Sequence, residues 1–401
     1  MTQTVSGQLL RETGDEERRQ RAVAALGLLE DGPQERFDRI TRLAHTIFGT
    51  SMAAITVVDG DRAWFPGQHG FSSGPVPREQ TLCERTMSEG QLMISEDTRA
   101  DPRFADKQAV QDGRVGFYAG QPLRDRTGTV IGTLCIYDEE PRRLTDQQVV
   151  ALRDLAIWAE RELRSEAEMS AAGEVQASML PPGDLEVDGW HVAGVCRPAL
   201  AVGGDFYDYG VAHSTLHVGM GDVMGKGTGA ALLGAGTRAA VRGTHAAVTA
   251  GADLGVTVTH VARTLLPDLE RAASFVTLFE AAIDLEEGLL RYVDAGMGLA
   301  LLRHADGTFE RLAGHDRPLG VLPDDHWTEH ETDLEPGDRM LVFSDGLLDL
   351  LPDPDGWVDA VGGLLSAHDT APGVLAAIAA LSDERVALDD VTAVAVYRAA
   401  A

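Results

Sequence analysis

The sequence predicts an α+β chain in which two domains are joined by a long helix. Helical and strand-like segments alternate before residue 143, one apolar stripe then continues from Thr145 to about Met179, and strands with Ala-rich helices follow Trp190. The length of 401 residues fits two or three domains, and 44% apolar residues are enough for well-packed cores. We expect a tail at 1–19, a first domain at 20–143, a linker helix at 144–180 and a second domain at 181–401.

Composition excludes some classes of function. The formal net charge of −29 argues against a nucleic-acid or anionic membrane surface, which would need clustered Lys and Arg. No apolar run approaches the roughly 20 residues that span a bilayer, and no secretion signal opens the chain, so we expect a cytoplasmic protein. Cys83, Cys135 and Cys196 lack the C-x-x-C spacing of zinc or redox sites and are expected to be buried, reduced thiols.

The first domain should contain a helix followed by antiparallel strands. In "ERFDRITRLAHTIFG" apolar residues recur at helical spacing until Gly49, a typical helix end. "SMAAITVVDGDRAWFPG" reads as two strands around an Asp-Gly-Asp turn, and "VGFYAGQPLRDRTGTVIGTLCIYD" as two more around "RDRTG".

The linker helix carries an apolar stripe at Val149, Leu152, Ala156, Ala159 and Leu163, with alternating gaps of three and four residues. This spacing predicts a short coiled-coil seam and a homodimer. A helix that packs on its own domain has the same periodicity and remains the alternative. "LPPG" at 180–183 ends the helix.

The glycine-rich stretch "GDVMGKGTGA" at 221–230 resembles a phosphate-binding loop, but it fails both nucleotide fingerprints. A Walker loop needs Ser or Thr after the lysine, whereas Gly227 follows Lys226. Gly219, Gly221 and Gly225, which precede Lys226, do not match G-x-G-x-x-G, because the second gap is one residue too long. What remains unusual is Asp222, a carboxylate at the end of a buried strand.

Several acids of the second domain share this context. Asp222 and Asp345 end apolar runs, Asp389 and Asp390 begin one, and Asp205 lies in "VGGDFYDY". If the strand after Asp389 pairs antiparallel to the strands before Asp222 and Asp345, the carboxylates of Asp222, Asp345 and Asp389 meet at one edge of the same sheet. Carboxylates gathered so closely repel one another unless a cation neutralises them. All-oxygen ligands favour Mg²⁺ or Mn²⁺ over zinc.

The same stretches identify a family resemblance. "VGGDFYDY", "GDVMGKGTGAALL", "SFVTLFEAAID", "YVDAG", "RPLGV", "GDRMLVFSDGLLD" and "DDVT" resemble, in order and context, the SpoIIE/RsbU-like branch of the PPM metal-dependent serine/threonine phosphatases. The resemblance runs from about Gly173 to the C-terminus and implies an α/β/β/α sandwich. "EVQASMLPP" is similar to the regulatory helix that opens this domain.

The resemblance also implies site residues. Asp222 would bridge two Mn²⁺ or Mg²⁺ ions, with the carbonyl of Val223 beside it, Asp345 and Asp389 would hold one ion, and Asp205 would hold the other. The second acid of the "DDVT" pair, Asp390, is a further metal candidate, and sequence does not separate it from Asp389. Lys226 would pair with substrate phosphate or remain a solvated surface lysine. Met297 stands where the family usually has His, and a thioether cannot handle protons.

The first domain resembles a bacterial GAF sensory domain through "RFDRITRLAHTIFG", "AAITVVDGDRAWF", "TLCERTM", "DPRFADKQAV" and "LTDQQVVALRDLA". The resemblance is specific for the fold and leaves the ligand unknown. Cys83 is followed by Glu84 rather than the His of chromophore attachment sites, which disfavours a covalent chromophore.

Together these features predict a phosphatase controlled by a GAF sensor, whose substrate by resemblance is a phosphorylated anti-sigma-factor antagonist. Water activated by two metal ions would attack phosphorus directly. The alternative is a non-catalytic GAF-linked binding module that docks signalling proteins; only Met297 favours it.

Overall fold

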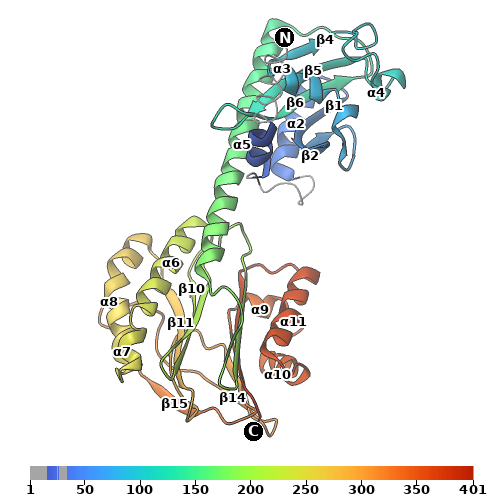
Figure 1. Cartoon of the computed structure of the whole chain (residues 1–401). Coiled ribbons are helices and arrows are strands. Elements are labelled where there is room, and N and C mark those ends of the chain that lie inside the picture. The colour runs from blue at the N-terminus through green and yellow to red at the C-terminus, as the bar shows by residue number, and fades with distance from the viewer. Residues whose placement is uncertain (1–15, 25, 27–33, 401) are drawn as a thin grey trace, which may run out of the picture. The chain divides into compact units, whose positions relative to one another are not determined.

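The computed structural model describes residues 16–24, 26 and 34–400, which form two compact units, Met1–Ala171 and Ala172–Ala401 (Figure 1). The expected tail at 1–19 lies mostly outside the described residues. A helical segment at 16–24 precedes the labelled elements. No helix in the described part is long and apolar enough to cross a membrane.

The N-terminal unit is one antiparallel sheet with strand order β3-β2-β1-β6-β5-β4. Its elements are α2 (Glu35–Phe48), β1 (Met52–Asp59), β2 (Arg62–His69), β3 (Val76–Pro77), η1 (Arg78–Gln80), α3 (Cys83–Glu89), β4 (Met93–Ser95), α4 (Gln108–Gln111), β5 (Phe117–Arg124), β6 (Val130–Asp138) and α5 (Asp146–Met179), which continues past Ala171. Helix α2 ends at Gly49, whose φ of 60° is the left-handed conformation that glycine adopts without strain. The predicted helix and strands of this domain are therefore confirmed.

Helix α5 confirms the helix expected from Thr145 to about Met179. The coiled-coil seam predicted along its apolar stripe is not confirmed. Leu152, Ala156, Ala159 and Leu163 are buried in the apolar cluster formed with α2 and the sheet of the same unit. The stripe therefore packs on the first domain, and the coiled-coil prediction was wrong for these residues. Domain packing and a coiled coil place apolar residues at the same spacing, which explains the error.

The C-terminal unit has two sheets packed face to face between two helical layers. Its elements are β7 (Leu185–Val187), β8 (Trp190–Arg197), β9 (Phe206–Ala212), β10 (Thr215–Val223), α6 (Thr228–Arg242), α7 (His245–Thr249), α8 (Leu254–Ala272), β11 (Val276–Asp284), β12 (Leu289–Ala295), β13 (Ala300–Arg303), β14 (Phe309–Arg311), β15 (His330–Asp333), β16 (Arg339–Phe343), α9 (Gly346–Asp349), α10 (Trp357–Ala367), α11 (Ala371–Glu384) and β17 (Val391–Arg398). One sheet has the order β15-β12-β11-β10-β9 and the other β14-β13-β16-β17-β8-β7.

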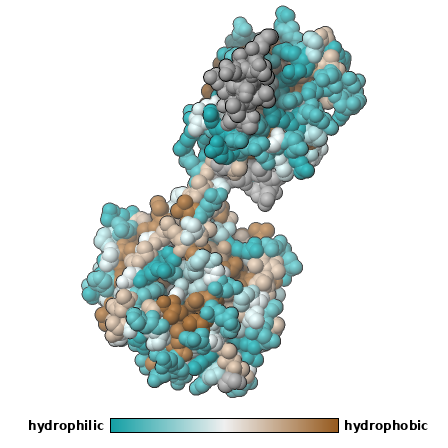
Figure 2. All heavy atoms as spheres, viewed as in Figure 1, coloured by the Kyte–Doolittle hydropathy of each residue, from teal (hydrophilic) through white to brown (hydrophobic). Residues whose placement is uncertain are grey.

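Three apolar clusters hold these layers together. Alternate residues of the strands, such as Val218 of β10 and Val394 of β17, fill the space between the sheets. The opposite faces are covered by α6 and α8 on the five-stranded sheet and by α10 and α11 on the six-stranded sheet (Figure 1). This is the predicted α/β/β/α sandwich. Hydrophilic residues cover most of the visible face of the N-terminal unit, while apolar patches interrupt that of the C-terminal unit (Figure 2).

Candidate metal centre

The predicted acids lie at strand ends of both sheets of the sandwich. Asp205 precedes β9 and Asp222 lies near the end of β10, in the five-stranded sheet, while Asp345 follows β16 and Asp389 and Asp390 precede β17, in the six-stranded sheet. The expectation that Asp222, Asp345 and Asp389 share one edge of a single sheet was therefore wrong for Asp222, whose strand lies in the other sheet. Strands β16 and β17 pair antiparallel as predicted, and β10 meets β17 across the space between the sheets.

Burial and mutual repulsion raise the pKa values of these acids. Asp205 is 3% exposed, and burial followed by repulsion from Asp222 raises its pKa well above the usual range. Burial, with repulsion from Asp345 next, raises the pKa of Asp222 to about 6. The pKa of Asp345 is raised by burial and then by Asp389. The cluster thus carries more negative charge than its surroundings neutralise, an excess that a divalent cation would offset.

The donor set also fits a hard cation. Asp205 Oδ2 is buried without a hydrogen-bond partner among the described residues, so one oxygen remains available for a ligand. Carboxylate oxygens with a nearby backbone carbonyl are the ligands that Mg²⁺ and Mn²⁺ prefer. No His or Cys is among the predicted ligands of this cluster.

Asp389 and Asp390 differ clearly in their surroundings. Asp390 is 5% exposed, and its two oxygens accept hydrogen bonds of 2.7 Å from the backbone amides of Ala199 and Gly204. Asp389 is half-buried, and its Oδ2 lies 3.0 Å from Nζ of Lys226. Asp390 therefore holds the loop before Asp205, while the Asp389 side chain remains accessible.

Lys226 lies among the acids, where it pairs with Asp389 and also donates to the carbonyl of Leu388. The hydrogen bond to Asp389 raises the pKa of this lysine. In this structure its charge is therefore used by the acid cluster rather than held free for a substrate.

Glycines allow the backbone of this region to approach closely. Gly225 and Gly227 have φ values of 108° and 77°, which side-chain-bearing residues rarely adopt. A Cβ on Gly204 would lie 2.8 Å from the carbonyl oxygen of Val223, so only glycine fits beside this predicted ligand. The glycine-rich stretch thus shapes the backbone around the acids.

Met297 does not fill the role of a polar residue beside the cluster. Its side chain is 9% exposed and belongs to the apolar core between the sheets. Its backbone amide donates to Asp294, 2.8 Å away, which fixes the turn. The Met297 side chain is therefore part of the apolar packing.

Sequence reasoning missed one residue that contacts the site, Gln176 near the end of α5. Its amide group donates to the carbonyl of Gly203 at 2.7 Å and accepts from the Gly203 amide at 3.1 Å. Gly203 lies two residues before Asp205, so α5 is tied to the loop that carries a predicted ligand. The stretch "EVQASMLPP" drew attention to this helix, but its spacing alone names no contact.

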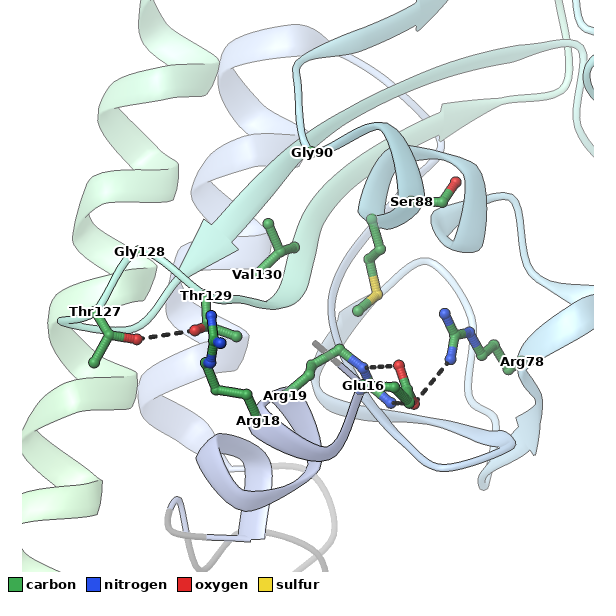
Figure 3. Close-up of a pocket in the computed structure, with 11 residues that line it drawn as sticks. Glu16, Arg18, Arg19, Arg78, Ser88, Gly90, Thr127, Gly128, Thr129 and Val130 are labelled. Atoms are coloured by element: carbon green, nitrogen blue, oxygen red, sulfur yellow. Dashed lines mark hydrogen bonds and ion pairs between the residues drawn. The ribbon is translucent and has the colours of Figure 1, made fainter. Parts of the chain in front are cut away.

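Two pockets lined by described residues of the N-terminal unit differ in their chemistry. One, of about 470 Å³, is lined by Glu16, Arg18, Arg19 and Arg78 and by the 127–130 turn, and Glu16 lies between Arg19 and Arg78 (Figure 3). The other, of about 380 Å³, is mostly apolar; Met52, Phe65, Phe71, Leu82 and Tyr137 are among its lining residues. A ligand of the first domain therefore has a cationic and an apolar pocket available.

Two of the three cysteines confirm the expectation of buried free thiols. Cys83 and Cys135 are buried, with their sulfur atoms 3.3 Å apart, and Cys83 also contacts the hydroxyl of Tyr137 at 3.0 Å. Cys196 is half-buried.

Both domains match known families. Residues 32–163 match the GAF domain model, and residues 212–399 match the model described as Stage II sporulation protein E (SpoIIE). Every predicted acid except Asp205 lies inside the second match.

Among curated proteins, the phosphoserine phosphatase RsbU of Bacillus subtilis is 26% identical over 192 residues, 47% of this chain and 55% of RsbU. The cyclic di-GMP phosphodiesterase PA2567 of Pseudomonas aeruginosa is 38% identical over 144 residues, 35% of this chain and 24% of that protein. This chain thus spans less than two thirds of the length of either relative. A solved structure of the RsbU and RsbW domains of Rv1364c from Mycobacterium tuberculosis aligns with a TM-score of 0.47 and 24% identity, covering 55% of this chain and 62% of that one.

Proposed function

We propose that this chain, which joins a GAF domain to a SpoIIE/RsbU-like PPM-type phosphatase domain, is a metal-dependent protein serine/threonine phosphatase. The observation that carries the proposal is the crowding of Asp205, Asp222, Asp345 and Asp389, which raises the pKa values of the first three. Such a cluster destabilises the protein unless it serves to bind cations.

In this proposal the acids divide between two Mn²⁺ or Mg²⁺ ions. Asp222 is repelled by Asp345 and Asp389 and in turn raises the pKa of Asp205. By resemblance it would be the bridging ligand, with the Val223 carbonyl beside it. Asp345 and Asp389 would hold one ion and Asp205 the other. Bound divalent ions would supply the positive charge that activates water and offsets charge on the phosphoryl group.

Two further residues act on these ligands. Asp390 fixes the backbone of the Asp205 loop through its bonds to Ala199 and Gly204, and its two oxygens are less available for a metal than those of Asp389. Lys226 neutralises Asp389 in the metal-free protein, and cation binding would release its ammonium group toward substrate phosphate.

The surroundings of the centre favour a protein substrate. Met224 and Leu388 directly follow or precede predicted ligands, and their side chains are exposed, as are those of Leu200 and Val386. Exposed apolar residues around a polar site are typical of protein docking surfaces. The RsbU resemblance makes a phosphorylated anti-sigma-factor antagonist the proposed substrate.

Regulation would reach the centre through α5. Gln176 bonds to both backbone groups of Gly203, so a shift at the end of α5 would move the Asp205 loop. An unidentified GAF ligand would change activity by favouring one position of the helix. The proposed homodimer cannot use the buried stripe; Val150 and Ile157, exposed at heptad spacing on α5, offer another face.

Hydrolysis of an aryl phosphate by the purified chain tests the proposal. We expect activity with Mn²⁺ or Mg²⁺, none with excess EDTA, and a loss of at least about 100-fold in Asp222→Asn, the scale seen when one charge-stabilising group is removed. Asp268→Asn, an exposed acid on α8 paired with Arg271, is the matched control and should keep full activity. Metal-independent turnover, or full activity in Asp222→Asn, would refute the proposal.

The same assay addresses the binding-module alternative. A chain that captures a phosphoprotein but releases no phosphate in the presence of Mn²⁺ would be such a module. If phosphate is released, the Asp222→Asn variant becomes a substrate trap, and phosphoproteins that it retains but the unaltered chain does not are the candidate substrates.

A further inference from the structure

A second group of ligand-type side chains lies on the other face of the β10–β11 pair. His217 on β10, His245 at the start of α7 and Glu280 on β11 each offer an atom within 4.8 Å of the others. Side chains alternate along a strand, and the neighbours of His217, Leu216 and Val218, belong to the core between the sheets. His217 therefore faces the helical layer, away from the face of Asp222.

Two of the three side chains are buried and incompletely satisfied, and His245 is half-buried. His217 and Glu280 are each 1% exposed, and neither Nδ1 of His217 nor Oε2 of Glu280 has a hydrogen-bond partner among the described residues. Leaving a buried polar atom without a partner costs about 1–3 kcal/mol. Two such atoms in one small cluster are therefore available to a ligand.

The existing contacts prepare these atoms for a cation. Nε2 of His217 lies 2.9 Å from the hydroxyl of Thr249; a proton on Nε2 donated to this hydroxyl leaves a lone pair on Nδ1. Nε2 of His245 lies 3.1 Å from Oε1 of Glu280. Burial, followed by repulsion from His245 and Arg291, lowers the pKa of His217 to about 3, so this ring is neutral, as a metal ligand must be.

The backbone also leaves room for the carboxylate. Gly219 of β10 pairs with Glu280 of β11, and a Cβ on Gly219 would lie 2.3 Å from Oε2 of Glu280. Glycine at this position therefore lets the Glu280 carboxylate lie over the backbone of β10, the strand that pairs with its own strand β11.

We propose that His217, His245 and Glu280 form a zinc site that ties β10, β11 and α7 together. Two imidazoles and one carboxylate are a ligand set that zinc accepts, with water in the fourth position. The two rings are stacked, with centroids 4.1 Å apart and planes 5° apart, so one of them must turn about its Cβ–Cγ bond when the ion binds. The site is separate from the oxygen ligands of the acid centre, because His217 and Asp222 lie on opposite faces of β10.

Zinc added to the chelator-stripped full chain tests this inference, through metal content and X-ray absorption at the zinc edge. We expect one zinc per chain with two histidine nitrogens at about 2.0–2.1 Å, and a higher thermal midpoint. The metal content is also measured in the Asp222→Asn variant, in which less zinc should bind at the acid centre. Zinc coordinated by oxygen alone, or no zinc retained, would overturn the proposal. This result comes from a chain with all three proposed ligands and so does not depend on whether the ligand variants fold.

Variants locate the site. Glu280→Gln should lose the histidine-bound zinc while keeping Mn²⁺-dependent activity, and Thr249→Val should weaken zinc affinity about 10–100-fold by removing the partner of His217. His260→Gln, an exposed histidine on α8, is the control and should bind zinc normally. Undiminished histidine-bound zinc in Glu280→Gln would refute the assignment.

Discussion

Asp390→Asn is expected to destabilise the C-terminal unit through the loop that carries Asp205. In the folded chain one oxygen of Asp390 accepts from Ala199 and the other from Gly204, both at 2.7 Å. The substitution turns one acceptor into an NH₂ group that faces a buried backbone donor. A hydrogen bond to a charged group contributes about 1.5–3 kcal/mol, and one such bond is lost. We expect a fall of about that size in the free energy of unfolding.

Asp389→Asn is the matched comparison. Asp389 is paired with the exposed Lys226, and such surface pairs contribute little to stability, while the substitution also relieves repulsion of Asp345. The cost in stability should therefore be much smaller than that of Asp390→Asn, although metal binding should be lost.

Urea unfolding of the metal-free variants, followed by tryptophan fluorescence and circular dichroism, measures this difference. Hydrogen exchange provides the local readout, because the amides of Ala199 and Gly204 should exchange faster in Asp390→Asn. If the two variants are equally stable, or if these amides remain protected in Asp390→Asn, Asp390 does not hold the loop and the distinction between the two acids fails.

Three further predictions follow from the same contacts. Met297→His should lower stability by about 1–3 kcal/mol, because it buries a polar ring in the apolar core, and should leave the pH profile of hydrolysis unchanged; a new ionisation in that profile would contradict the packing. The double variant Leu152→Asp, Leu163→Asp should unfold the N-terminal unit, because both side chains are fully buried there. A folded monomer, shown by circular dichroism and sedimentation, would instead support the coiled-coil interpretation of this helix. Because the folded-state pKa of Asp222 is raised to about 6, the folded protein holds its proton at higher pH than the unfolded chain does. Metal-free stability should therefore fall as pH rises from about 4 to 6, and Mn²⁺ affinity, measured by calorimetry, should rise over that range and level off above it; constant affinity would count against Asp222 as a ligand.

Local structure could be predicted well from the sequence. Strand-like apolar runs on either side of turn residues identified β1, β2, β5 and β6, and Gly49 marked the end of α2, because these signals depend only on neighbouring residues. The apolar runs that end at Asp222 and Asp345 were likewise recognised as strands.

Long-range arrangement was less accessible. An apolar run does not reveal which sheet its strand joins, so Asp222 was assigned to the sheet of Asp345 although the two lie on facing sheets. The stripe through Leu152 could not distinguish a partner helix from its own domain. His217 and Glu280 escaped notice because they are far apart in sequence and come together only through strand pairing.

Anomalous diffraction at the manganese edge, from crystals of the chain grown with Mn²⁺, tests the central claim most directly. The account predicts two manganese peaks beside the Asp222 carboxylate, one also contacted by Asp345 and Asp389 and the other on the side of Asp205, and none in Asp222→Asn crystals. No peak at these acids in the unaltered chain, or the same two peaks in Asp222→Asn, would contradict it.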